Sequence, residues 1–148
     1  MSLPPLLHLE KVEDYRRYYI SNYCCEKIFT FDSIRVRFRS EQFAHAFYES
    51  SAKNGWKDGF SWERAKRINW IKETLENPKA DSYQGRDKRN NSYDNNRRIS
   101  VVYENFVVII DITKKGAVTE PLMTTFVTAY PADQYAMEKI RKAPRWKR

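Results

Sequence analysis

The apolar run at positions 106–110 constrains the fold of this chain more than any other part of its sequence. The run reads Phe-Val-Val-Ile-Ile and lacks the apolar–polar alternation of a half-buried strand. A strand of this kind is typical of the centre of a sheet, where both faces are covered. Glu104-Asn105 precede the run as a turn signal, so 97–103 and 106–112 are predicted to form a hairpin. The chain is therefore expected to be built on a β-sheet.

Helical spacing of apolar residues recurs in four other segments. The first helix is predicted to present one apolar and aromatic face, formed by Leu9, Val12, Tyr15, Tyr19 and Tyr23. Ser40 is predicted to cap a helix over 41–52, and Ser61 to cap another that ends at Asn77-Pro78. The predicted buried stripe of that latter helix is Trp62, Ala65, Ile68, Ile71 and Leu75. Pro131 is predicted to open a final helix through about Arg141.

A two-residue period marks the remaining strands. Segments 27–31 and 34–38 flank the turn signal Asp32-Ser33, and the arginines at 35 and 37 alternate with apolar residues. Segment 124–129 is a further strand, in which Phe126 is expected to point inward. Because helices and strands are grouped along the chain, the predicted fold class is α+β. The helices are expected to pack on one side of a small antiparallel sheet, with one helix at the C-terminus.

Two polar stretches lie outside these elements. Residues 79–97 hold several cations and asparagines but few apolar side chains, so they are predicted to form a long, exposed basic loop. Residues 141–148 are predicted to form a basic tail. The 148 residues match the usual size of one domain and contain no internal repeat, so 1–148 is expected to be a single domain.

The charge of the chain points to a polyanionic partner. Lys and Arg number 27 against 19 Asp and Glu, which gives a net charge of +8. Such an excess attracts phosphate polymers, and aromatic residues, 15% of the chain, can stack on bases as well as fill a core. RNA is the expected partner, with DNA as the second choice. The sequence shows no membrane-length apolar run and no leader, so a cytoplasmic location without membrane contact is expected.

The sequence favours chemistry without a metal or cofactor. His8 and His45 are far apart, no Cys/His group has zinc spacing, and the adjacent Cys24 and Cys25 are expected to be free thiols. RNA cleavage without a metal needs a proton-transfer group and a cation for the phosphate. His45 is the candidate for proton transfer because imidazole can accept and donate a proton near neutral pH. The alternative is that His45 is only a packed or capping helix residue.

Several other residues are candidates for contact with a nucleic acid. Arg97 and Arg98 enter a strand where a guanidinium could bind a phosphate through two hydrogen bonds, although charge at a strand start is commonly just solvated. Thr125, Thr128 and Tyr130 could donate hydroxyl hydrogens to phosphate oxygens. The alternative is that these residues have no such role and are present because threonine and tyrosine are common in strands. The cations of the predicted loop, Arg86, Lys88 and Arg89, are candidates for nucleic-acid binding.

Four segments together resemble a known family. Segments 43–47, 62–71 before Asn77-Pro78, 99–112 and 126–131 resemble, over about 26–131, the phage-associated branch of the barnase, EndoU, colicin and RelE-like (BECR) ribonuclease superfamily. The resemblance implies an N-terminal helical part on a small antiparallel sheet, with metal-independent RNA cleavage on the open face of the sheet. His45 matches the helix-borne histidine of the family, Arg98 the strand cation, and Thr128 the threonine of the late strand. The chain departs from several relatives because the matching region has no second histidine, and Glu104 lies in a turn.

The leading hypothesis is thus a phage- or toxin-related endoribonuclease-like domain with His45, Arg98 and Thr128 as catalytic residues and Tyr130 positioning the substrate. An inhibitor protein would be a further partner. One alternative is a non-catalytic module that binds RNA or another single strand through Arg86, Lys88, Arg89 and Tyr83 or Tyr93. Another is a structural or interaction protein of a phage or prophage. Neither the RNA target nor the oligomeric state follows from the sequence.

Overall fold

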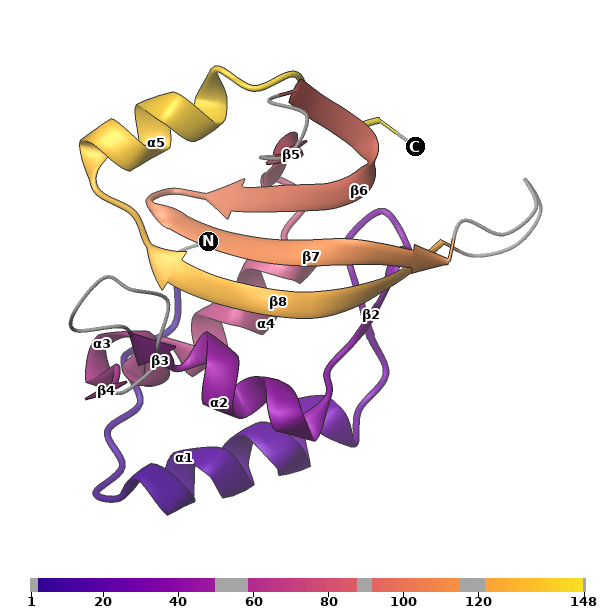
Figure 1. Ribbon diagram of the computed structural model, residues 1–148. Helices are drawn as coiled ribbons and strands as arrows, with labels where there is room; N and C mark the ends of the chain where they lie inside the picture. Colours follow the sequence, from indigo (N-terminus) through magenta and orange to yellow (C-terminus); the bar gives the residue numbers. More distant parts are fainter. Residues whose placement is uncertain (1–2, 50–58, 88–91, 115–121, 148) are drawn as a thin grey trace.

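In the part of the chain that the structure describes, a six-stranded sheet forms the centre (Figure 1). The computed structural model describes residues 3–49, 59–87, 92–114 and 122–147. Within these ranges the strand order is β1-β2-β8-β7-β6-β5, and β3 and β4 form a separate pair. The strands are β1 (Ile28–Phe29), β2 (Arg35–Arg37), β3 (Tyr48–Glu49), β4 (Gly59–Phe60), β5 (Asp81–Asp87), β6 (Ser92–Tyr103), β7 (Phe106–Lys114) and β8 (Met123–Pro131).

Neighbouring strands of the main sheet run antiparallel except β2 and β8, which are parallel. The helices are α1 (Val12–Tyr19), α2 (Phe43–Ala46), α3 (Trp62–Lys66), α4 (Ile68–Glu76) and α5 (Gln134–Arg141), with a π-helical turn at Ile20–Cys24 and a 3₁₀ turn at Ser40–Gln42. The α+β class and the mostly antiparallel sheet are therefore confirmed. So is the hairpin, in which Tyr103 pairs with Phe106 across the turn.

The apolar run of β7 is covered on both faces, as its sequence predicts. Val107 and Val108 point to opposite faces of the sheet, and both are fully buried. Val108 belongs to the larger core beneath α1–α4, whereas Val107 packs in a second core with Met137 of α5. Figure 1 shows α5 on one side of the sheet and α1–α4 on the other. The expectation that all helices pack on one side is wrong, because a strand that is apolar on both faces needs cover on both.

The N-terminal helical segments differ from prediction in length but keep the predicted faces. Tyr15, Tyr19 and Tyr23 are all buried, and a π-helical turn after Tyr19 keeps Tyr23 on the core side. The helix predicted over 41–52 is instead α2, which stops at Ala46, and the next residues pair with β4. Where the chain leaves the helix, the Phe47 carbonyl accepts a hydrogen bond from Ser61 N–H at 2.8 Å. Residues 50–52 lie outside the described ranges.

The two predicted serine caps have different outcomes. The Ser61 hydroxyl accepts a hydrogen bond from Arg64 N–H at 3.3 Å, so the predicted cap is confirmed. Ser40 instead begins a 3₁₀ turn, and its hydroxyl donates to the Glu41 carboxylate at 3.2 Å. The helix after Ser61 is divided by a turn at Arg67 into α3 and α4. Ala65, Ile68, Ile71 and Leu75 are buried as predicted, but Trp62 is exposed.

The predicted basic loop over 79–97 is wrong. Its described residues lie mostly in β5 and in the first half of β6, which pair with each other. The main-chain hydrogen bonds of an edge strand do not depend on apolar side chains, and edge strands commonly carry charged residues. The polar composition of 79–97 is therefore compatible with strands and does not by itself indicate a loop. Lys88 and Arg89 lie outside the described ranges.

The C-terminal segment is anchored rather than extended away from the domain. Trp146 is 8% exposed and belongs to the main core, and its N–H donates to the Ser82 carbonyl at 2.9 Å. The Pro144 carbonyl accepts from Gln84 N–H at 2.8 Å, so the segment runs along β5. The final helix starts after the predicted Pro131, because β8 continues to that proline and the Asp133 carboxylate caps α5.

Candidate functional site

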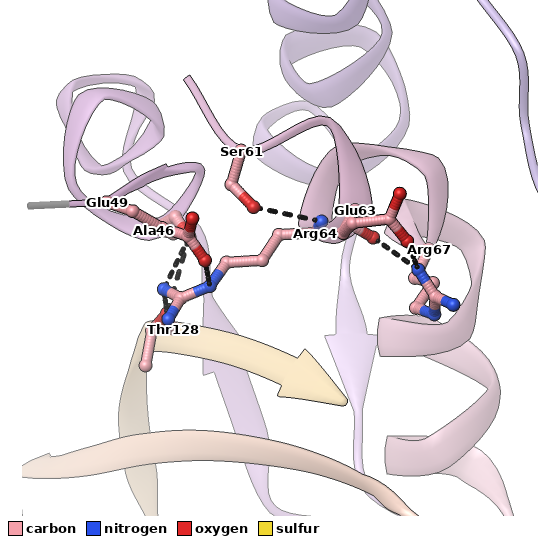
Figure 2. Close-up of polar contacts among 7 residues, drawn as sticks. All are labelled: Ala46, Glu49, Ser61, Glu63, Arg64, Arg67 and Thr128. Carbon is pink, nitrogen blue, oxygen red and sulfur yellow. Dashed lines mark hydrogen bonds and ion pairs between the residues drawn. The ribbon is translucent and has the colours of Figure 1, made fainter. Parts of the chain in front are cut away.

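Arg64 of α3 lies at the centre of a polar cluster formed by four elements (Figure 2). Its Nη1 donates to the Thr128 hydroxyl of β8 at 3.3 Å and to the Ala46 carbonyl of α2 at 3.4 Å. Its Nε lies 3.6 Å from the Glu49 carboxylate of β3. The guanidinium also lies over the Tyr130 ring, 5.5 Å from its centre. Arg64 thus contacts groups from α2, β3 and β8 at one place. Only 20% of its side chain is exposed.

The path of β8 explains why this cluster forms. β2 pairs with residues 123–125 of β8, and beyond them the edge of β8 contacts α2. There Gln42 Nε2 donates to the Val127 carbonyl at 2.6 Å, and the Thr128 hydroxyl donates to the Ala46 carbonyl at 3.4 Å. A register shift opposite Ile109 and Ile110 precedes Thr128. Such bulges redirect side chains, and here Thr128 and Tyr130 face Arg64.

Burial and charge act in opposite directions on Tyr130. Burial raises the pKa of its hydroxyl, and the nearby Arg64 guanidinium lowers it by a smaller amount. The net shift is upward, so Tyr130 is protonated at neutral pH and can donate a hydrogen bond. The cluster thus offers a guanidinium and two hydroxyl groups, which are suitable donors for the oxygens of a phosphate.

His45 lies beside this cluster in the chain but not within it. It directly precedes Ala46, whose carbonyl accepts bonds from Arg64 and Thr128. Phe43 and Ala46 are the buried residues of α2, and the His45 side chain is exposed. Among the described residues, none is hydrogen-bonded to its ring. The imidazole is therefore accessible to solvent.

Arg98 lies apart from the Arg64 cluster. Its Nε and Nη2 bind the two oxygens of Asp111 on β7, at 2.6 and 3.3 Å. Arg98 and Thr128 lie on the same face of the sheet. They are separated by two strand spacings and by two residues along the strands, which corresponds to ~12 Å between their Cα atoms. His45, Arg98 and Thr128 therefore do not meet at one point, and the cation beside Thr128 is Arg64.

The remaining predicted residues have mixed positions. Tyr130 belongs to the cluster, and Arg97 is exposed on β6, where it makes contacts of its own. Arg86 is in β5, but its side chain is outside the described part of the structure, as are Lys88 and Arg89. The pairing of Arg98 with Asp111 could have been found from the sequence, because the predicted turn at Glu104-Asn105 sets these residues opposite each other. No sequence signal distinguishes Arg64 from the other cations of its helix.

The described residues contain no group of three or more His, Cys, Asp or Glu side chains that could hold a metal ion. No helix within the same ranges is long and apolar enough to cross a membrane. Searches against protein-family models, curated proteins and solved structures found no match to this chain. The resemblance to the ribonuclease superfamily therefore stays a prediction.

Proposed function

We propose that this protein acts on RNA and cleaves it without a metal ion, at the cluster of Arg64, Thr128 and Tyr130 beside His45. The observation that carries the proposal is the position of Arg64. A largely buried guanidinium donates to the Thr128 hydroxyl and lies over the Tyr130 ring, and it also contacts the chain segment of an exposed histidine through the Ala46 carbonyl. This set can supply the proton transfer and the phosphate stabilisation that cleavage requires.

In the proposed reaction, His45 accepts the proton of a 2′-hydroxyl as that oxygen attacks the adjacent phosphorus. The bond from phosphorus to the 5′-oxygen then breaks, and His45 returns the proton to the leaving oxygen. The products are a 2′,3′-cyclic phosphate and a 5′-hydroxyl, so no other reactant is consumed. Arg64 stabilises the pentavalent phosphate, while Thr128 and Tyr130 donate hydrogen bonds to its oxygens. Because the present contacts of Arg64 measure 3.3–3.6 Å, phosphate oxygens can replace them with shorter ones.

The test is cleavage of a labelled RNA in the presence of chelator. His45→Ala and Arg64→Gln should each lower the rate by about 100-fold or more, without loss of the folded state by circular dichroism. His8→Ala is the matched control, since His8 is exposed and is the other histidine of the chain. DNA of the same sequence should remain intact because it lacks the attacking hydroxyl. Cleavage by His45→Ala at the wild-type rate would disprove the proposal.

A second candidate is RNA binding without cleavage. It is favoured by two observations: Arg98 is bound to Asp111, and the structure assigns no partner that orients His45 among the described residues. Under this candidate, RNA binds in a salt-sensitive manner and is recovered intact. An affinity that does not change between ~50 and ~200 mM salt would argue against both candidates and favour a structural or interaction protein.

A further inference from the structure

One end of the sheet is not covered by α5. The helix packs against Val102 of β6 and Val107 of β7 through Met137. Further along the same face, a row of four residues crosses β2, β8, β7 and β6 in register, and it consists of Arg37, Thr125, Asp111 and Arg98. Residues paired directly across strands project to the same face. The alternate residues, such as Val36 and Ile110, are in the core beneath. All four members of the row are at least partly exposed.

A second row lies beside the first at the β1 edge. Phe29 pairs with Arg35, and the Arg35 guanidinium lies over the Phe29 ring at 5.6 Å from its centre. The Phe29 side chain points away from the core and is 41% exposed. The Nε of Arg35 is buried and has no hydrogen-bond partner in the described part of the chain. We call the six residues Phe29, Arg35, Arg37, Thr125, Asp111 and Arg98 the open sheet face.

The charges of the open sheet face suit a polyanion. Three arginines stand against one carboxylate, and that carboxylate is already bound by Arg98. β5 also approaches Arg98 closely, because a Cβ at Gly85 of β5 would lie 2.7 Å from the Arg98 Cβ and Cγ. The close approach of the two strands, together with Asp111, fixes the orientation of the Arg98 guanidinium. Arg98 is thus preorganised, which lowers the entropy lost when a ligand binds.

The open sheet face continues toward the Arg64 cluster. Thr128 and Tyr130 follow Thr125 along β8, and their β7 partners, Ile109 and Val107, lie on the same face as Asp111. The row from β2 to β6 crosses three strand spacings, ~14 Å. Thr128 lies two β7 residues from this row, ~7 Å along the strands, so a chain of phosphates on the row can reach Thr128 by turning along β8 on the same face.

We propose that the open sheet face binds single-stranded RNA, with an unpaired base stacked on Phe29 and backbone phosphates at Arg35, Arg37 and Arg98. This inference rests on the proposed function in taking RNA as the substrate, and it adds where the strand lies before it enters the cluster. The occupant is single-stranded because only an unpaired base can stack on an exposed ring. Four-stranded sheets are known to bind roughly two or three bases in this way.

The test measures binding separately from cleavage. The probe is a fluorescent 2′-O-methyl RNA of about 12 nucleotides, within the usual range of single-strand sites, which cannot be cleaved through its 2′-oxygen. Its dissociation constant is followed by anisotropy. Phe29→Ala should raise the constant about 10-fold, as expected for loss of one stacked base. Arg37→Gln should weaken binding and lower the salt slope by about 0.7, the value for one single-strand phosphate contact.

Two matched variants serve as controls. Phe31→Ala removes a similarly exposed ring outside the two rows, and Arg17→Gln removes an exposed cation of α1, on the other side of the sheet. Both should bind as the wild type does. Phe29→Tyr should also retain affinity, because it preserves a stacking ring and the fold. Equal losses from Arg17→Gln and Arg37→Gln, or wild-type affinity for Phe29→Ala, would overturn the proposal.

The remaining outcomes separate this inference from the proposed function. Tight binding that depends on Phe29 and Arg37, with no cleavage of unmodified RNA, supports the open sheet face and refutes the reaction. Cleavage of RNA that is insensitive to Phe29→Ala and Arg37→Gln supports the reaction and refutes this face. Binding of single-stranded DNA with the same affinity would refute the assignment to RNA.

Discussion

Gly85 lacks a side chain at a point where β5 and β6 approach each other closely. A Cβ at this position would meet Arg98 at 2.7 Å, and the contacted Cβ of Arg98 cannot rotate away. Gly85→Ala is therefore expected to lower the free energy of unfolding by about 1–3 kcal/mol, the usual cost of overpacking. Gly59→Ala is the control, because its Cβ would meet the Glu49 carbonyl only at 3.8 Å. Urea denaturation that shows equal effects for the two variants would contradict this reading of the β5–β6 contact.

Two buried tyrosines make the stability of the protein sensitive to alkaline pH. Burial raises the pKa of Tyr19 and of Tyr23 well above the ordinary value for tyrosine. In the unfolded chain these hydroxyls lose their protons near pH 10, whereas in the folded state they retain them. The free energy of unfolding should therefore be independent of these groups below about pH 10 and should fall above it.

Tyr19→Phe tests this pH dependence. The variant should show a shallower loss of stability above about pH 10. At neutral pH it should be less stable by about 1 kcal/mol, because Tyr19 donates to the Arg39 carbonyl at 2.8 Å. Tyr135→Phe is the control, since Tyr135 is 76% exposed. Denaturant unfolding at several pH values measures both effects, and an unchanged alkaline slope in Tyr19→Phe would count against the role of burial.

At the scale of elements, helix starts depend on single side chains. The Asp133 carboxylate accepts a hydrogen bond from Ala136 N–H at 2.8 Å and so caps α5. Asp133→Ala should lower the free energy of unfolding by about 1 kcal/mol. Ser40→Ala should have almost no effect, because within the described residues the Ser40 hydroxyl bonds only to the exposed Glu41 side chain. Thermal unfolding distinguishes the two, and a larger effect from Ser40→Ala would mean that Ser40 caps a helix after all.

At the scale of the whole molecule, the C-terminal segment closes the domain along β5. Asp81 binds Arg145 at 2.9 Å and Arg141 at 3.3 Å, and Tyr83 lies against both arginines. These ion pairs are partly exposed and contribute little by themselves. The stronger anchor is Trp146, whose ring belongs to the main core although it lies near the end of the chain.

Trp146→Ala tests this anchor. Removal of a buried tryptophan should lower the free energy of unfolding by about 3–5 kcal/mol. Tyr135→Ala, on the outer surface of α5, should change it by less than about 0.5 kcal/mol. Chemical denaturation gives both values. A small effect of Trp146→Ala would show that the C-terminal segment is not part of the cooperative unit.

The sequence by itself determined the elements whose patterns are local. The run 106–110 was predicted to be a central strand, the turn at Glu104-Asn105 was predicted to set the hairpin, and both are confirmed. The same holds for the Ser61 cap and for the buried face of Tyr15, Tyr19 and Tyr23. Each of these features depends on residues a few positions apart, so the information that fixes it lies within a short window of sequence.

Tertiary structure alone decided three further features. Polar residues of 79–97 became strands because β5 and β6 supply main-chain hydrogen bonds to each other. Helix α5 covers the face that the other helices leave open. Arg64 came to lie beside Thr128, 64 positions away, because the edge of β8 passes α2 and α3. Contacts between residues so far apart depend on how whole elements pack. No periodicity in the chain encodes them locally, so the candidate site could be predicted only in part.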